Sequence, residues 1–129
     1  MTSRFRELVI DCQDPRSLAR FWCDVLGYRV IDDSEGEVEI AGNDPTAEDA
    51  GQRPMLPTLL FVPVPEAKTV KDRLHIDVSP IDSTQAEEVE RLIALGARRV
   101  DIGQGEQPWV VLADPEGNEF CVLGPRPSQ

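Results

Sequence analysis

The sequence predicts an α+β fold made of two β-α-β-β-β modules. Three observations favour it: strand and helix patterns occur in that order twice, residues 8–11 resemble residues 74–77, and residues 109–123 read as a closing hairpin. A repeat of roughly 65 residues is too long for a solenoid unit. Because 129 residues suit a single core, we expect one domain built from two fused modules.

The first half begins with an apolar strand at residues 7–12 and continues into a helix. Asp14 is expected to cap that helix, with Pro15 at its first position and Gly27 just past its end. Apolar residues recur at helical spacing between these limits, at Leu18, Phe21, Trp22, Val25 and Leu26. Strands are then predicted at residues 28–31, 37–40 and 58–64. The polar segment 42–57 predicts a long loop, either a lid over a cavity or a disordered surface loop.

The second half repeats this order. A strand is predicted at residues 74–78, and Ser83 or Thr84 caps a helix that ends at Gly96. Another strand is predicted at residues 98–102. An Asp-Pro-Glu-Gly-Asn turn joins the two strands of the closing hairpin, because proline fixes φ there and glycine accepts a positive φ.

Composition and charge narrow the classes of partner and the cellular location that we expect for this chain. The net charge of −11, from 24 acidic and 13 basic residues, argues against nucleic acid as a partner, since phosphates need a basic surface. The acidity suits a cationic ligand or simply keeps the protein in solution. No apolar run reaches the roughly 18 residues that span a bilayer, and the N-terminus lacks a signal-peptide core, so we expect no membrane association and a cytoplasmic location. Three scattered cysteines are expected to be reduced.

The chain resembles the vicinal oxygen chelate superfamily, which includes glyoxalase I, extradiol dioxygenases, fosfomycin-resistance enzymes and bleomycin-resistance proteins. The resemblance runs from Asp14-Pro15 through Phe21-Trp22 to residues 25–27, then to His75, and then to the turn at residues 114–118. It is most similar to the actinobacterial glyoxalase-like domain group, through residues 64–66, 68–71 and 73–77.

This resemblance implies a single glyoxalase-like domain over residues 1–129. Module 1 would span about residues 5–65 and module 2 about residues 72–124, each folded as a curved sheet. Together they would form a half-open, barrel-like sheet around a cavity. Metal enzymes of this type hold a divalent metal there with four ligands, which stabilises negative charge on two substrate oxygens.

The implied ligand positions fall on Glu7, Phe61, His75 and Cys121. Phe61 cannot bind a metal, so Glu7, His75 and Cys121 would be ligands only if a metal is bound. That set suits Mg, Mn or Ni chemistry poorly. Glu119 lies on the same face of its strand as Cys121 and would replace it only if the register shifted. We therefore expect no cofactor, with a divalent metal as the alternative.

Each of these residues also has a plainer interpretation. Glu7 suits a surface position at a strand end, and Cys121 suits simple packing. His75, the only histidine, is either a general base within an apolar strand or a hydrogen-bonded structural residue. Asp11 and Asp77 occupy matching strand positions, where they would bind a cationic ligand or share a proton, or meet for structural reasons alone.

Three functions remain open at this level. The first is a small-molecule-binding protein of the glyoxalase and bleomycin-resistance type, with Phe61, Trp109, Asp11, Asp77 and Cys121 lining its cavity and Trp109 stacking on a flat ligand. The second is a metal-dependent lyase, isomerase or dioxygenase with a reduced ligand set, in which His75 and Glu7 are catalytic. The third is a structural or partner-binding domain with a filled cavity. The resemblance also implies a homodimer.

Overall fold

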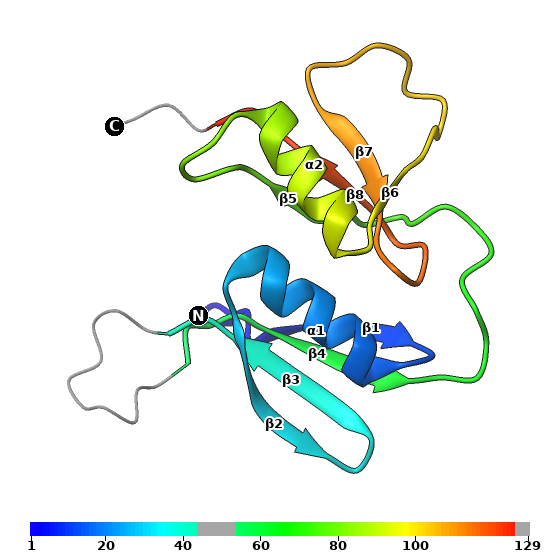
Figure 1. The fold of residues 1–129 in the computed structure, drawn as a ribbon. Coiled ribbons are helices and arrows are strands. Elements are labelled where there is room, and N and C mark those ends of the chain that lie inside the picture. Colours follow the sequence, from blue (N-terminus) through cyan, green and yellow to red (C-terminus); the bar gives the residue numbers. More distant parts are fainter. Residues whose placement is uncertain (44–53, 126–129) are drawn as a thin grey trace. The chain divides into compact units, whose positions relative to one another are not determined.

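The computed structural model describes residues 1–43 and 54–125. The chain divides into two compact units, Met1–Ala67 and Lys68–Gln129. Each unit holds one β-α-β-β-β module with its own four-stranded mixed sheet (Figure 1). The α+β class and the two modules predicted from the sequence are therefore confirmed.

The first module contains β1 (Glu7–Cys12), α1 (Pro15–Leu26), β2 (Arg29–Ser34), β3 (Glu37–Ala41) and β4 (Thr58–Pro63). Its strands lie in the order β1-β4-β3-β2, with β1 parallel to β4 and the other pairs antiparallel. Helix α1 packs on β3 and β4 (Figure 1). Large apolar side chains fill this layer and are almost wholly buried: Leu18, Trp22, Val38, Ile40 and Phe61.

Helix α1 begins and ends where the sequence predicted. A carboxylate oxygen of Asp14 accepts a hydrogen bond from the Ser17 backbone N–H at 3.2 Å, which satisfies one of the free donors at the helix N-terminus. Gly27 ends the helix with φ of 70°, a left-handed conformation that glycine adopts without strain. The chain therefore leaves the helix in a defined direction and enters β2.

The second module contains β5 (Asp77–Val78), α2 (Gln85–Leu95), β6 (Arg98–Arg99), β7 (Val110–Ala113) and β8 (Glu119–Val122). Its strand order, β5-β8-β7-β6, repeats the topology of the first module. Apolar side chains from α2, β7 and β8 are buried together: Val89, Leu92, Leu112, Phe120 and Val122.

Two strands of the second module are shorter than predicted. The strand expected at residues 74–78 is only β5, whose pairing with β8 is confined to Asp77 opposite Cys121 and Val78 opposite Val122. His75 therefore precedes the strand instead of lying within it, which corrects the sequence-based placement. The strand expected at residues 98–102 is only β6, and two positive-φ glycines, Gly103 and Gly105, follow in the loop before β7.

Helix α2 begins with a capping box that resolves the choice between Ser83 and Thr84. The Thr84 hydroxyl accepts a hydrogen bond from the Glu87 backbone N–H, and the Glu87 carboxylate accepts one from the Thr84 backbone N–H. Thr84 is therefore the cap. The backbone and hydroxyl of Thr84 hold the pKa of Glu87 below its ordinary value.

Thr84→Ala should lower the free energy of unfolding by about 1 kcal/mol at neutral pH, the usual cost of losing a helix cap. The pKa of Glu87 is lowered in the folded state, so its carboxylate stabilises the fold at pH values above the ordinary pKa of glutamate. This stabilisation is lost as the pH falls through the lowered pKa of the folded state. Urea unfolding at neutral and acid pH would show a smaller penalty in acid. Ser83→Ala is the control, because the Ser83 hydroxyl contacts only the Thr84 carbonyl, at 3.4 Å; an equal penalty there would contradict the assignment.

The predicted loop at residues 42–57 is described only at its ends, where Asn43 pairs with Pro54 in an isolated antiparallel bridge. The lid interpretation concerns residues 44–53, which lie outside the described residues. Within residues 1–43 and 54–125, no helix has the length and apolar character needed to cross a membrane.

Candidate functional site

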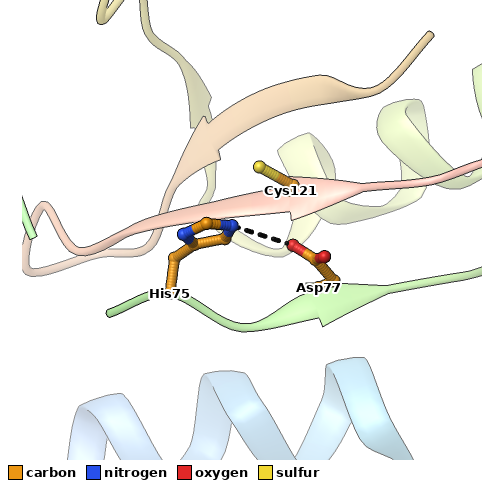
Figure 2. A group of neighbouring side chains, drawn as sticks. All are labelled: His75, Asp77 and Cys121. Carbon is orange, nitrogen blue, oxygen red and sulfur yellow. Dashed lines mark ion pairs between the residues drawn. The ribbon is translucent and has the colours of Figure 1, made fainter. Parts of the chain in front are cut away.

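The candidate site is built where β5 and β8 pair in parallel. Asp77 lies opposite Cys121, and the Cys121 backbone N–H donates to the Ile76 carbonyl at 3.0 Å. His75 lies two residues before Asp77, just upstream of β5, and its imidazole contacts the Asp77 carboxylate. Figure 2 shows the imidazole and the carboxylate facing each other, with the Cys121 side chain projecting from β8 beside them.

These three side chains form a close cluster, here called the His-Asp-Cys cluster. His75 Nε2 lies 3.1 Å from Asp77 Oδ1, and one ligand atom from each residue lies within 4.8 Å of the others. The His75 and Asp77 side chains are 48% and 47% exposed, whereas Cys121 is buried. The cluster therefore combines a fixed thiol with two side chains that solvent can reach.

The thiol of Cys121 is held in its protonated form. Burial raises the pKa of Cys121, and the Asp77 carboxylate raises it further through its charge and by accepting a hydrogen bond from the thiol. The positive charge of Lys71 acts in the opposite direction and is outweighed. Without a ligand that stabilises the thiolate, Cys121 is a weak nucleophile at neutral pH.

A pocket of about 180 Å³ opens beside the cluster, and we call it the second-module pocket. A cavity of about 150 Å³ accommodates benzene, so this volume suits a ligand with a single ring. Trp109, 36% exposed, and Ile102 supply apolar surface. The complete lining is Lys71, Asp72, His75, Ile102, Gln104, Trp109, Glu119 and Cys121.

Glu119 fixes the segment that forms one side of this pocket. Its Oε2 atom lies 2.5 Å from Lys68 Nζ, and its Oε1 atom accepts the Asp72 backbone N–H at 3.0 Å. Burial alone would raise the pKa of Glu119, but the Lys68 and Asp72 contacts outweigh it and the pKa is lowered. Burial and the neighbouring Glu119 charge raise the pKa of Asp72. Glu119 is thus a charged anchor whose two oxygens are both engaged.

Four of the seven residues predicted for the site lie together in the second module. His75, Trp109 and Cys121 line the pocket, and Asp77 completes the His-Asp-Cys cluster. The expectation that Glu119 shares a face with Cys121 is confirmed, because both line the pocket.

The other three residues predicted for the site belong to the first module. Glu7 pairs with Thr58 at the start of β1 and is partly exposed. Asp11 is exposed. Phe61 has no exposed surface and pairs with residues of both neighbouring strands, so it fills the core of its own module.

The structure adds lining residues that sequence reasoning did not assign to the site. Lys71 and Asp72 lie in the connection before β5, and Ile102 and Gln104 lie in the loop before β7. Neither segment has a periodic pattern. The Gln104 side chain accepts the Ile102 backbone N–H at 2.8 Å, so this loop is shaped by local side-chain bonds that spacing does not reveal.

Comparison with known families decides the relationship that this topology suggests. The glyoxalase-like domain family matches residues 7–123, nearly the whole chain. The chain belongs to this family. It is thereby a glyoxalase-like protein of the vicinal oxygen chelate superfamily. Comparison with curated proteins finds no match.

Solved structures share the fold of this glyoxalase-like protein at low sequence identity. A mutant of fosfomycin resistance protein FosX from Listeria monocytogenes, complexed with Mn(II) and 1S,2S-dihydroxypropylphosphonic acid, has a TM-score of 0.67 and 15% identity over 98% of this chain and 95% of its own. FosX from Mesorhizobium loti gives 0.65 and 14% over 98% and 94%. A glyoxalase/bleomycin resistance protein/dioxygenase family enzyme from Burkholderia phytofirmans gives 0.61 and 18% over 90% and 94%.

The donor set of the glyoxalase-like chain fits a hard metal such as Mn²⁺ poorly. Hard ions favour carboxylate, carbonyl and water oxygens, whereas this cluster supplies one thiol, one imidazole and one carboxylate. Glu119, the other carboxylate on this face, is engaged by Lys68 and Asp72. A soft or borderline metal is chemically better matched than the Mn(II) of the FosX complex.

Proposed function

We propose that this glyoxalase-like protein binds a small, flat organic ligand in the second-module pocket, without a tightly bound metal. The observation that carries the proposal is the lining itself. It has an apolar wall at Trp109 and Ile102, and polar groups at Lys71, His75 and Cys121. Ligand pockets typically combine such an apolar surface with a few polar groups that fix orientation.

Residues at and beside the pocket contribute to this binding in different ways. Trp109 stacks on the ring of the ligand, and Ile102 excludes water from it. Asp77 accepts a hydrogen bond from His75 Nε2 when the imidazole is neutral, which leaves Nδ1 as an acceptor for a polar substituent. Lys71 favours a substituent that carries partial negative charge. Glu119 keeps the Lys68–Asp72 segment in place, and with it the side chain of Lys71.

Tryptophan fluorescence tests this proposal directly. The chain has two tryptophans, and Trp22 is buried in the first module, so Trp22→Phe leaves Trp109 as the sole reporter at the pocket. Single-ring aromatic acids, phenols and amines would be titrated against this variant, with and without a chelator. We expect saturable quenching by at least one class, unchanged by the chelator.

The matched controls reverse the roles of the two tryptophans. In Trp109→Leu the reporter is Trp22, and calorimetric affinity for the same ligand should fall about tenfold, since losing an aromatic contact costs roughly 1 to 1.5 kcal/mol. Equal affinity in Trp109→Leu and the unmodified chain would remove the pocket from the proposal. Binding that disappears with the chelator would favour a metal-dependent function, the second candidate described next.

The second candidate is a divalent-metal-dependent lyase, isomerase or dioxygenase. The observation that favours it is the His-Asp-Cys cluster, whose three ligand atoms are close enough together to bind one metal ion. There the metal would act as a Lewis acid on two neighbouring oxygens of the substrate. We also propose that the protein forms a homodimer and acts in the cytoplasm. Light scattering of the purified chain would measure its oligomeric state.

A further inference from the structure

We infer that the ligand of the second-module pocket is a single-ring aromatic zwitterion, a compound that carries one ammonium group and one carboxylate group. Asp72 binds the ammonium, and Lys71 and Gln104 bind the carboxylate. This inference rests on the proposed function, which gives the ligand its flat shape. It adds the charges that the ligand carries and assigns each charge to a residue of the pocket.

Asp72 is an acidic group of the pocket whose charge is only partly neutralised. Lys68 Nζ lies 3.9 Å from Asp72 Oδ1, but it lies closer to Glu119 Oε2, at 2.5 Å. One ammonium is therefore shared between two carboxylates, and Asp72 has the weaker contact. Burial and the Glu119 charge raise the pKa of Asp72, and the Lys68 charge offsets them only in part. An ammonium group on the ligand supplies the positive charge that Asp72 lacks.

The other two carboxylates near the pocket already have partners. Glu119 uses one oxygen for Lys68 and the other for the Asp72 backbone N–H. Asp77, beside the pocket, contacts His75 Nε2 at 3.1 Å. A ligand ammonium that paired with either residue would compete with a contact that the folded chain makes by itself. Asp72 is therefore the carboxylate that a cationic group of the ligand binds most favourably.

Lys71 is the basic residue that lines the pocket, and its ammonium has only a weak contact within the protein. Its Nζ donates to the Asp72 carbonyl at 3.4 Å, and Lys71 has no ion pair within the part of the chain that the structure describes. Burial raises the pKa of the Cys121 thiol, and the Lys71 charge partly opposes this effect. The ammonium of Lys71 therefore lies near Cys121, where it attracts an anionic group.

Gln104 gives the pocket a second hydrogen-bond donor. Its Oε1 atom accepts the Ile102 backbone N–H at 2.8 Å, so the side-chain N–H groups are the part of the amide that a ligand can contact. A carboxylate accepts hydrogen bonds at both of its oxygens, and bonds to a charged partner are stronger than neutral ones. Lys71 and Gln104 thus suit a carboxylate better than a neutral carbonyl.

A ligand with both charges satisfies both parts of the pocket at once. A ligand that carries only a carboxylate leaves Asp72 with its weak contact to Lys68, and one that carries only an ammonium leaves Lys71 without an anion. A zwitterion also adds no net charge to a protein whose own net charge is −11. Its ring packs against Trp109, as the proposed function requires.

Matched probes test the charges of the ligand, with fluorescence of the Trp22→Phe variant as the measurement. Phenylalanine would be compared with phenylethylamine, which lacks the carboxylate, and with phenylpropanoate, which lacks the ammonium. Aminomethylbenzoate, in which the ring separates the charges, would be compared with benzylamine and toluate. We expect at least one zwitterion to bind about tenfold more tightly than each of its singly charged analogues, because each charge adds a charge-assisted hydrogen bond.

Two variants assign each charge to its residue. Asp72→Asn should weaken binding of the zwitterion about tenfold without weakening that of the carboxylate analogue. Lys71→Met should weaken binding of the zwitterion without weakening that of the amine analogue. A merely structural role would lower all three affinities together. Glu90→Gln and Arg99→Met are the controls, because they remove one exposed charge of each sign away from the pocket and should change none of the affinities.

Two results would overturn the inference: zwitterions that bind no more tightly than both of their analogues, or variants that lower the three affinities equally. Failure here is distinguishable from failure of the proposed function. A pocket that binds singly charged or neutral aromatic compounds as tightly as zwitterions keeps the proposed function and loses this inference. A protein that binds none of the single-ring compounds loses both.

Discussion

Asp114→Ala should lower the free energy of unfolding by about 3 kcal/mol, the largest single effect that we expect in the second module. Asp114 is 1% exposed at the start of the turn between β7 and β8. Its Oδ1 accepts the Glu116 and Asn118 backbone N–H groups, each at 2.9 Å, and its Oδ2 accepts the Asn118 side-chain amide at 3.0 Å. Alanine would leave these donors without their charged acceptor.

Urea unfolding monitored by circular dichroism would measure this change. Asp101→Ala is the matched control, because Asp101 accepts only the Gly103 backbone N–H, at 2.8 Å, in an exposed loop. It should cost less than about 1 kcal/mol. Asp114→Asn keeps one acceptor oxygen and should fall between the two. A penalty for Asp114→Ala no larger than that of Asp101→Ala would show that the turn does not depend on this carboxylate.

Lys68→Met should cost about 2 kcal/mol, because it leaves the Glu119 carboxylate buried without its cation. The methionine keeps most of the apolar stem of lysine, so packing changes little. Loss of the Lys68 contact also weakens the attachment of the Lys68–Asp72 segment to Glu119. Ligand affinity should therefore fall together with stability. Chemical denaturation and the fluorescence titration would be run on the same preparation.

A double-mutant comparison separates the charge effect from packing. Adding Glu119→Gln to Lys68→Met removes the unpaired charge and keeps an oxygen for the Asp72 backbone N–H, so more than half of the lost stability should return. Lys71→Met is the matched control for the stability measurement alone, since Lys71 lines the pocket and its exposed ammonium donates to the Asp72 carbonyl at 3.4 Å. Equal losses of stability in Lys68→Met and Lys71→Met would contradict the role of Glu119 as anchor.

Most of the fold could be predicted because local chemistry and long-range packing agree. Asp14, Gly27 and Thr84 mark helix ends by hydrogen bonds and backbone conformation that depend on a few neighbouring residues. The lengths of β5 and β6 could not be predicted, since each strand ends where its regular pairing with the neighbouring strand stops, and the apolar pattern does not mark that point. Apolar residues such as Leu74 continue the strand pattern beyond the last available hydrogen bond.

The candidate site was predictable only where strand alternation applies. That rule placed Glu119 and Cys121 on one face, and both line the pocket. The connection carrying Asp72 follows no period, and its position depends on a single distant carboxylate 47 residues along the chain. Such a contact has no signature in one sequence. The resemblance drew attention to Glu7 and Phe61, but the exposure of each could be learned only from the structure.

Because the strand order is the same in both modules, equivalent positions of the two halves can be compared directly. Asp77 pairs with Cys121 across β5 and β8, and Asp11 pairs with Val62 across the equivalent strands β1 and β4. Counting two residues back from each aspartate gives His75 in one half and Val9 in the other. The two halves thus differ at this locus by a histidine and a cysteine on the same backbone frame. Two side-chain differences on one repeated backbone are therefore enough to place the His-Asp-Cys cluster in the second half and to leave the equivalent positions of the first half without it.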